Sequence, residues 1–421
     1  MKKLAVIGTG IAGMGSAYFL RHDFDITFYE KNDYPGGHTH TVIIDEEGAS
    51  VPVDTGFIVY NETTYPNLTQ LFKELDVKSR ATAMSFSVTD VPGDLFYKAT
   101  GFSNLFVQKR NIFKPWFWRM LLQIERFQKD FAAILADPRW EGASLSEYVR
   151  ENGYDDNFVD KFLVPMAAAL WSCPREEVMR FPAVTLVRFF VNHRFLGLQG
   201  QHQWKTVAGG SRNYRDKILA LFPGRVRLSC PAVRVERAAD GVMVQDVSGA
   251  RERFDQVVIA AHADQALAML ASPDGQEREL LGAFGYQPNQ AVLHSDGAVM
   301  PPLKRAWAAW NYWMDGKRPA VISYDMNILQ DVSKKKDYLV SLNDNGAVDP
   351  ARVHWSGVYD HPLFNAAAYR AQKSLSRLNE HGPVYFCGSY FRYGFHEDAL
   401  TSAVEVAHRI LGRTPEGYKR F

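Results

Sequence analysis

The chain has 421 residues, which is enough for two domains, and 46% of them are hydrophobic, as is usual for globular proteins. Its 48 basic and 47 acidic residues almost cancel, so charge gives no reason to expect a nucleic acid partner. Three scattered cysteines exclude a disulfide framework and a cysteine metal site, and they favour a reducing compartment. We find no signal peptide and no apolar run of about eighteen residues, so we expect a cytoplasmic protein.

The first thirty residues have the pattern of a strand, a glycine-rich turn, a helix, a second strand and an acid. We predict strands at Leu4–Ile7 and Asp25–Tyr29, with a helix of small residues at Met14–Arg21 between them. The three glycines of the turn at 8–13 permit a tight bend, close approach to a pyrophosphate, and close packing of the helix. The helix N-terminus offers N–H groups to that pyrophosphate, and Glu30 is placed to bind a ribose diol. The pattern therefore predicts a dinucleotide-binding site.

Two kinds of segment alternate along the rest of the chain. Elements that continue the dinucleotide-binding pattern are predicted at Thr41–Ile44, Val51–Asp54, Pro66–Leu75, Asn213–Leu221, the hairpin 226–246, Phe254–Ala261, Val384–Gly388 and Glu397–Leu411. Between them, Ala81–Gln199 is aromatic and mostly helical, and Tyr286–His354 is aromatic and rich in strands. We therefore expect an α/β fold with a Rossmann-type dinucleotide-binding domain and a discontinuous α+β substrate domain. The first would comprise 1–80, 200–270 and 375–421, and the second 81–199 and 271–374.

A second glycine pair, Gly36-Gly37, follows the acid, and a plain NAD dehydrogenase has no need of it. With the turn 54–56 and the closing motif 386–388, it resembles the flavin-containing amine oxidase and phytoene desaturase superfamily. The resemblance implies an amine oxidase-like domain that binds FAD in an extended form. Because Cys387 is expected to be buried, the FAD would be non-covalent. The implied cofactor-binding residues are Gly8, Gly10, Ile11, Ala12, Gly13, Glu30, Lys31, Gly36, Gly37, His38, Thr39, Thr55, Gly56, Phe57, Ala232, Ala260, Gly388, Glu397, Asp398 and Ala399.

A narrower resemblance concerns the run 53–62 (VDTGFIVYNE), together with Ala291–His294 and Trp310–Tyr312. These segments are similar to bacterial FAD-binding oxidoreductases that accompany cyclopropane-fatty-acyl synthase-like methyltransferases, some of them linked to furan fatty acid formation. The resemblance implies desaturation of a methylated fatty acyl chain of a phospholipid, with a lipid methyltransferase as partner. The alternatives are a flavin amine or porphyrinogen oxidase, and a non-catalytic FAD-bound partner of the methyltransferase.

Amine oxidases of this superfamily usually carry a lysine beside the flavin, on the strand that corresponds to Pro288–His294. No lysine occurs between Ala283 and Pro302, which argues against ordinary amine oxidation. His294 is our candidate for a catalytic base, and the alternative is a strand histidine with a structural hydrogen bond. His396 and Glu397 are expected near FAD, with helix capping as the simpler alternative.

The segment 109–129 combines basic and aromatic residues. This composition suits peripheral contact with an anionic membrane surface, at the inner face of the membrane. The alternative is an ordinary helix of the substrate domain with a core stripe and a solvated basic face. The membrane interpretation is stronger if the substrate is a phospholipid acyl chain.

Overall fold

A five-stranded parallel sheet carries the N-terminal glycine turn. The structure is a computed structural model and describes residues 1–194 and 202–421. The strand order is β10-β2-β1-β14-β20, with bounds Val226–Arg227, Phe24–Tyr29, Lys2–Ile7, Gln256–Ile259 and Val384–Phe386. In register, Ala5 of the central strand pairs with Thr27 on one side and Val257 on the other. Because both faces of a parallel sheet are covered, the central strands contain short apolar runs, Leu4–Ile7 in β1 and Val257–Ile259 in β14.

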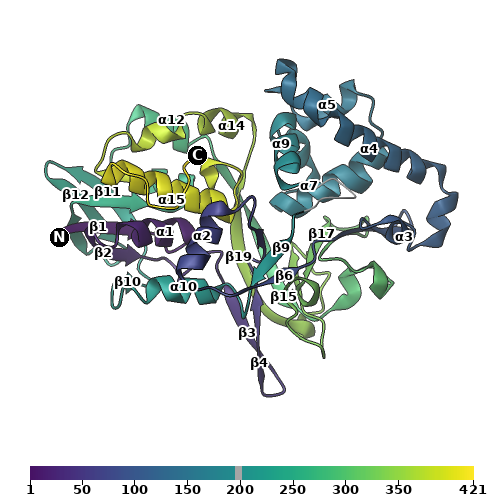
Figure 1. The fold of residues 1–421 in the computed structure, drawn as a ribbon, viewed down its shortest axis with the longest axis horizontal. Helices are drawn as coiled ribbons and strands as arrows, with labels where there is room; N and C mark the ends of the chain where they lie inside the picture. Colours follow the sequence, from purple (N-terminus) through teal and green to yellow (C-terminus); the bar gives the residue numbers. More distant parts are fainter. Residues whose placement is uncertain (195–201) are drawn as a thin grey trace.

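Two helices pack against each other over this sheet, α1 (Ile11–Leu20) and α15 (His396–Leu411) (Figure 1). Small residues on α1 permit the close approach, since a Cβ on Gly15 would lie 2.6 Å from Leu400 Cδ1. The adjacent helices are α2 (Pro66–Glu74) and α10 (Arg212–Leu219). This packing brings the first and last segments of the chain into one layer, as the predicted Rossmann-type domain requires.

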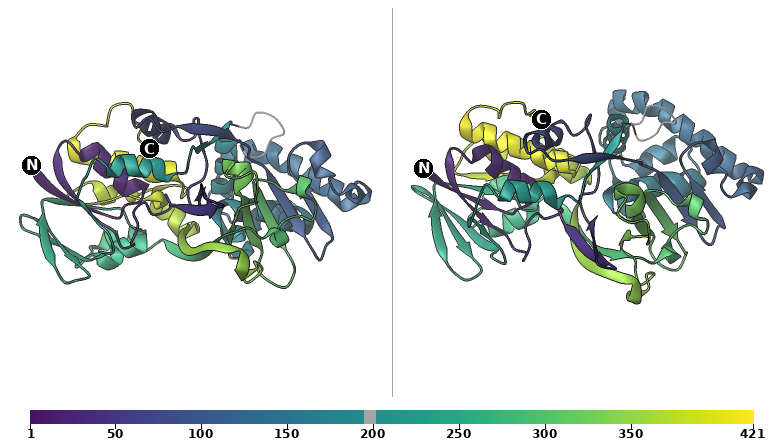
Figure 2. Two further views of the ribbon diagram at one scale, coloured as in Figure 1. Left: turned by 90° about the horizontal axis from the view of Figure 1, so that it is seen from below. Right: turned by 60° about the horizontal axis from the view of Figure 1, so that its bottom comes forward.

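A seven-stranded sheet forms the base of the second lobe. Its order is β19-β15-β18-β17-β16-β7-β8, with bounds Val353–Leu363, Gly285–His294, Leu339–Leu342, Val321–Asp325, Trp310–Met314, Phe86–Asp90 and Leu95–Lys98. The long antiparallel pair β15–β19 runs from this sheet towards the parallel sheet (Figure 2). Residues at the parallel-sheet end of β19 can therefore reach a site between the lobes.

Helices make up the rest of the second lobe. They are α3 (Phe102–Leu105), α4 (Pro115–Ala136), α5 (Leu145–Glu151), α6 (Asp156–Phe158), α7 (Val164–Trp171), α8 (Arg175–Arg180) and α9 (Ala183–His193). The predicted apolar stripe of α4 is confirmed, because Phe117, Met120 and Phe127 are buried in the aromatic core. No helix in the described ranges 1–194 and 202–421 is long and apolar enough to cross a membrane.

Three smaller sheets, four further α-helices and several short 3-10 or π helices make up the rest of the described residues. The sheets are β3–β4 (Thr41–Glu46, Ala49–Asp54), β5-β9-β6 (Tyr60–Asn61, Trp204–Val207, Ser79–Thr82) and β11-β12-β13 (Ala232–Ala238, Gly241–Asp246, Arg251–Phe254). The helices are α11 (Ala263–Met269), α12 (Gly275–Leu281), α13 (Met326–Gln330) and α14 (Ala366–Gln372). The structure differs from the predicted hairpin 226–246 at its first strand. Its first two residues form β10 in the parallel sheet, and the antiparallel pairing starts at Ala232.

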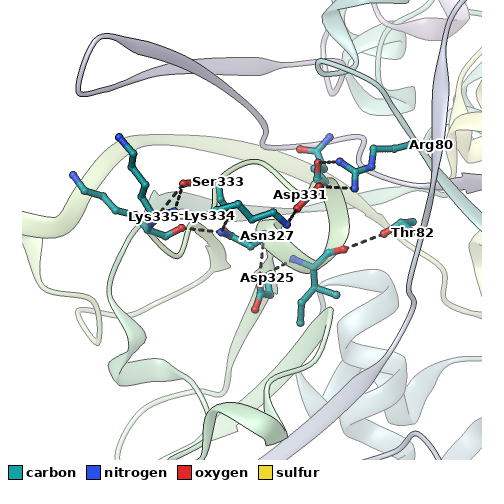
Figure 3. Close-up of polar contacts among 11 residues, drawn as sticks. Arg80, Thr82, Asp325, Asn327, Asp331, Ser333, Lys334 and Lys335 are labelled. Atoms are coloured by element: carbon teal, nitrogen blue, oxygen red, sulfur yellow. Dashed lines mark hydrogen bonds and ion pairs between the residues drawn. The ribbon is translucent and has the colours of Figure 1, made fainter.

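Polar contacts tie α13 to β6 (Figure 3). The Arg80 guanidinium donates to the Gln330 carbonyl oxygen at 3.1 Å and pairs with Asp331 at 2.9 Å. Thr82 Oγ1 donates to the Ile328 carbonyl oxygen at 3.3 Å. These bonds hold the corner of the seven-stranded sheet against the small sheet that contains β9.

The predicted division into two domains stays a prediction. All strands of the parallel sheet fall within 1–80, 200–270 and 375–421, and all strands of the seven-stranded sheet fall within 81–199 and 271–374. Strand β6 crosses the expected boundary at 80/81, and the boundary at 199/200 lies outside the described residues.

Candidate functional site

The glycine turn at 8–13 places the start of α1 beside a cavity. Gly8 has a φ of +99°, and a Cβ there would lie 2.6 Å from the Ala260 carbonyl oxygen. A Cβ on Gly13 would lie 2.0 Å from the Gly8 carbonyl oxygen, so α1 can start this close to β1 only with glycine at both positions. Gly10 is the N-cap of α1 and has no side-chain cap. The first N–H groups of α1 are therefore available to an anion in the cavity.

Glu30 is fixed at the carboxyl end of β2. Its carboxylate accepts hydrogen bonds from the Thr9 amide at 3.0 Å, from the Thr9 hydroxyl, and from the Asn32 amide at 2.9 Å. The side chain is buried yet lines the cavity. Since two carboxylate oxygens offer about four acceptor sites, one remains for a diol on the cavity side.

The second glycine pair packs against the first turn. The Gly36 amide donates to Thr9 Oγ1 at 2.9 Å, and a Cβ on Gly37 would lie 3.4 Å from Gly10 Cα. Both glycines have positive φ, +114° and +57°. Sequence segments that are 27 residues apart thus form one edge of the cavity.

The cavity has a volume of about 670 Å³ and extends from the glycine turn into the second lobe. The predicted cofactor-binding residues that line it are Gly8, Gly10, Ile11, Ala12, Glu30, Lys31, Gly37, His38, Thr55, Gly56, Phe57, Ala232, Ala260, Gly388 and Ala399. We call its far part the apolar end, lined by Ile58, Val59, Tyr65, Ala169, Leu170, Ser172, Phe189, Trp204, Trp310, Tyr324, Leu342 and Phe395.

Five predicted cofactor-binding residues do not line the cavity: Gly13, Gly36, Thr39, Glu397 and Asp398. Gly13 and Gly36 pack against residues that do line the cavity, Gly8 and Thr9. Thr39 is buried and its hydroxyl bonds to Tyr214.

Glu397 and Asp398 act as helix caps. Glu397 accepts the amides of Asn67 and Leu68, both at 2.9 Å, and so caps the N-terminus of α2 rather than of its own helix. Asp398 accepts the Phe395 amide at 2.9 Å, in the first turn of α15. Both acids therefore act within the protein fold.

His294, the predicted base, does not line the cavity either. It is fully buried in the seven-stranded sheet, where Nε2 bonds to Ser341 Oγ at 2.7 Å and Nδ1 accepts the Asp296 amide at 3.1 Å. Burial lowers the pKa of His294 to about 4. Both ring nitrogens are used within the protein, which matches the alternative of a structural histidine.

Rings from distant segments stack along the middle of the cavity. His38 lies on Tyr359, with ring centroids 4.7 Å apart, and His361 lies 5.4 Å from His38. His396 stacks on Phe57 at 3.9 Å. Our sequence reasoning missed Tyr359 and His361. The available signal was their i, i+2 spacing, which puts both on one face of strand β19.

A hydrogen-bonded chain leads from the cavity wall to a half-buried histidine. The Tyr359 hydroxyl lies 2.7 Å from Thr55 Oγ1, and Thr55 Oγ1 lies 2.8 Å from His40 Nδ1. Burial lowers the pKa of His40 to about 4, and the nearby Arg215 adds to this. The imidazole is therefore neutral near pH 7, and the three side chains form one continuous hydrogen-bonded chain from the cavity wall.

Several buried polar atoms at the cavity have no hydrogen-bond partner within the described part of the chain. They are His38 Nε2, His262 Nδ1 and the Tyr390 hydroxyl, and all three residues line the cavity. Buried polar groups are normally paired, so these atoms indicate a polar ligand. With the glycine turn and Glu30, the cavity fits an extended dinucleotide.

We expect the apoprotein to lose stability as the pH falls from about 6.5 towards 4. Burial lowers the pKa of His38 to about 4 and of His361 to about 3, so the unfolded chain binds protons that the folded chain does not. Each such histidine should lower the free energy of unfolding by more than about 1 kcal/mol between pH 6.5 and pH 4. Urea unfolding at a series of pH values measures the loss.

The matched variant for this prediction is His361→Asn, which replaces the titrating ring by an uncharged amide at the place where His361 Nδ1 lies 2.7 Å from Asn289 Nδ2. Its stability should change less steeply with pH than that of the parent. Equal slopes in the two proteins would contradict the assignment of a neutral His361.

The family of flavin containing amine oxidoreductases matches residues 11–310. A 1-hydroxycarotenoid 3,4-desaturase of Flavobacterium sp. (strain P99-3) is 30% identical over 125 residues, which cover 26% of this chain and 24% of that protein. Cyclohexylamine oxidase from Brevibacterium oxydans IH-35A superposes with a TM-score of 0.71 at 15% identity, over 98% of this chain and 100% of that one. A CLA-producing fatty acid isomerase from P. acnes superposes with a TM-score of 0.65 at 13% identity, over 96% of this chain and 97% of that one. These likenesses confirm the predicted fold class.

Proposed function

Because this chain belongs to the family of flavin-containing amine oxidoreductases, we propose that it uses non-covalently bound FAD to desaturate a methylated fatty acyl chain of a phospholipid. The family makes the protein a flavin-dependent oxidoreductase. When bound, a flavin accepts a hydride, and an acyl chain that becomes an alkene releases one hydride and one proton. The protein must therefore hold an apolar chain, exclude water and carry the proton away.

The residues around the glycine turn would hold the FAD. The N–H groups at the start of α1 suit the pyrophosphate, Glu30 suits the ribose diol, and Gly37 leaves room beside Gly10. Non-covalent binding is supported by Cys387, which is fully buried, contacts Ser16 Oγ at 3.5 Å and does not line the cavity. Burial also raises the pKa of this thiol to about 12, so it stays unreactive.

The apolar end of the cavity is the observation that carries the substrate proposal. It continues directly from the dinucleotide-binding half and is walled by aliphatic and aromatic side chains of α7, α9 and the seven-stranded sheet. An alkyl chain has few polar handles, and a water-poor apolar wall is the environment that binds it. The name of the structurally similar fatty acid isomerase shows that this fold can serve an acyl substrate in another protein.

Charged groups in the cavity argue against an amine substrate. Among the described residues that line it, Lys31 is the only lysine, and Glu30 and Asp360 are the only carboxylates. None of the three belongs to the apolar end. A buried ammonium group without a carboxylate partner would be strongly destabilised there. An amine or porphyrinogen oxidase is therefore our second choice.

We assign proton removal to the chain Tyr359, Thr55 and His40. The Tyr359 oxygen would take the substrate proton while its own proton moves to Thr55 Oγ1, whose proton moves to His40 Nδ1. His40 is only half-buried, so it can pass that proton on to solvent. This path keeps charge out of the apolar end.

Anaerobic reduction of the purified holoprotein tests the proposal. Phospholipids with methyl-branched or unsaturated chains should bleach the oxidised flavin absorbance, whereas simple amines and polyamines should leave it unchanged. Bleaching by amines alone would overturn the acyl-chain proposal. If neither bleaches it while dithionite does, a non-catalytic role beside a lipid methyltransferase becomes the better explanation, and a stable complex with such an enzyme should then be found.

A further inference from the structure

The 3-10 helix Lys109–Phe113 and the start of α4, which follows it, expose four large apolar side chains to solvent. Ile112, Phe113, Trp118 and Leu122 have exposed fractions of 46%, 84%, 39% and 65%. We call these four the apolar patch. They are distinct from the buried stripe of the same helix, which includes Phe117 and faces the core. Phe113 and Leu122, the two most exposed members of the patch, are therefore available for contact with another surface.

The patch is held together locally. Trp118 Nε1 donates to the Ile112 carbonyl oxygen at 2.9 Å, and the indole packs on Phe106 with centroids 5.0 Å apart. Leu122 lies one helical turn after Trp118 and so shares its face of α4. The helical lobe that carries α4 lies at the opposite end of the molecule from the N-terminus (Figure 1). The patch therefore belongs to the lobe that lies away from the N-terminus.

The segment that carries the patch is rich in basic residues. Residues 109–129 contain six lysines and arginines and a single acid, Glu125. Four of the six form ion pairs: Arg110 with Asp94, Arg119 with Asp155 at 3.2 Å, Arg126 with Asp130 at 3.7 Å, and Lys129 with Glu125 at 2.7 Å. Lys109 is exposed and forms no ion pair within the described ranges. The net local charge remains positive.

We propose that the apolar patch docks on the surface of an anionic phospholipid bilayer. Aromatic and aliphatic side chains would enter the interface, and the lysines and arginines of the same segment would contact lipid phosphates. Lys109 and Lys114, which form no ion pair within the described residues, place positive charge beside the apolar side chains and so favour an anionic lipid surface. The inference does not depend on the reaction proposed above, since binding to vesicles needs no turnover.

Co-sedimentation of the holoprotein with vesicles tests the surface. We expect binding to phosphatidylcholine vesicles that contain phosphatidylglycerol, weaker binding to phosphatidylcholine alone, and weakening by salt. The double variant Phe113→Ser/Leu122→Ser should bind about ten-fold more weakly or worse, because it removes two apolar side chains from the bilayer. Lys109→Glu should weaken binding to the anionic vesicles only.

The matched control is Leu221→Ser/Val247→Ser, which alters two exposed apolar residues away from α4. It should bind like the parent, and both double variants should retain flavin and the parental melting temperature. Absence of parental binding to anionic vesicles, or equal losses in the two double variants, would overturn the proposal. A dimer seen in sedimentation velocity that only the α4 variant abolishes would instead assign the patch to a second copy of the chain.

Discussion

Replacing Gly10 by alanine should leave the protein folded and weaken FAD binding about 100-fold, which corresponds to about 2.8 kcal/mol. Gly10 is the N-cap of α1, has an extended backbone at φ −62° and lines the cavity. An added Cβ would meet no protein atom within 4 Å, so the fold tolerates it. It would project into the space where the pyrophosphate must approach the backbone. Titration of the apoprotein with FAD, followed by flavin fluorescence, measures the loss.

Alanine substitutions at two other glycines serve as controls for Gly10→Ala. Gly142→Ala also adds a Cβ that meets nothing within 4 Å, away from the cavity, and should bind FAD normally. Gly13→Ala should instead destabilise the protein itself, because its Cβ would collide with the Gly8 carbonyl oxygen. If Gly10→Ala binds FAD as tightly as the parent, the placement of the pyrophosphate at α1 is wrong.

Replacing Tyr359 by phenylalanine should slow reduction of the flavin by the acyl substrate about 100-fold, because the proton relay loses its first member. The ring and its stacking on His38 are retained, so FAD affinity should stay within a few-fold of the parent. Stopped-flow absorbance of the anaerobic half-reaction, in H₂O and in D₂O, gives the rate and the solvent isotope effect. The isotope effect of the parent should disappear in the variant.

The control for this variant is Tyr324→Phe. Tyr324 lines the apolar end, and its hydroxyl donates to the Ala169 carbonyl oxygen at 3.3 Å, outside the relay. It should keep the parental rate and isotope effect. Thr55→Val should resemble Tyr359→Phe, because it interrupts the same path. A normal rate in both relay variants would refute the path and leave the proton acceptor to be found elsewhere in the cavity.

The glycine spacing was sufficient to predict the dinucleotide-binding half. Gly8, Gly13 and Glu30 act within thirty residues, where local backbone geometry and one strand pairing decide the arrangement. The same holds for α4, whose buried stripe follows directly from its 3.6-residue period. Local patterns of this kind can be read from sequence because neighbours in the chain remain neighbours in the fold.

The roles of residues whose partners are distant in the sequence could not be predicted from local patterns. Glu397 looked like a residue near the cofactor, but its carboxylate caps α2, which lies 330 residues earlier in the chain. His294 sat in a plausible strand, yet the pleat turns it into the sheet interior and onto Ser341. Tyr359 and Thr55 meet only because β19 reaches back to the parallel sheet.

Short-range periodicity and backbone sterics were therefore enough to predict the dinucleotide-binding turn, the α/β class and the apolar face of α4. They were not enough to predict which titratable side chains face the cavity. That choice depends on strand pleat and on the packing of segments hundreds of residues apart, where one residue of register moves a side chain from the cavity to the core.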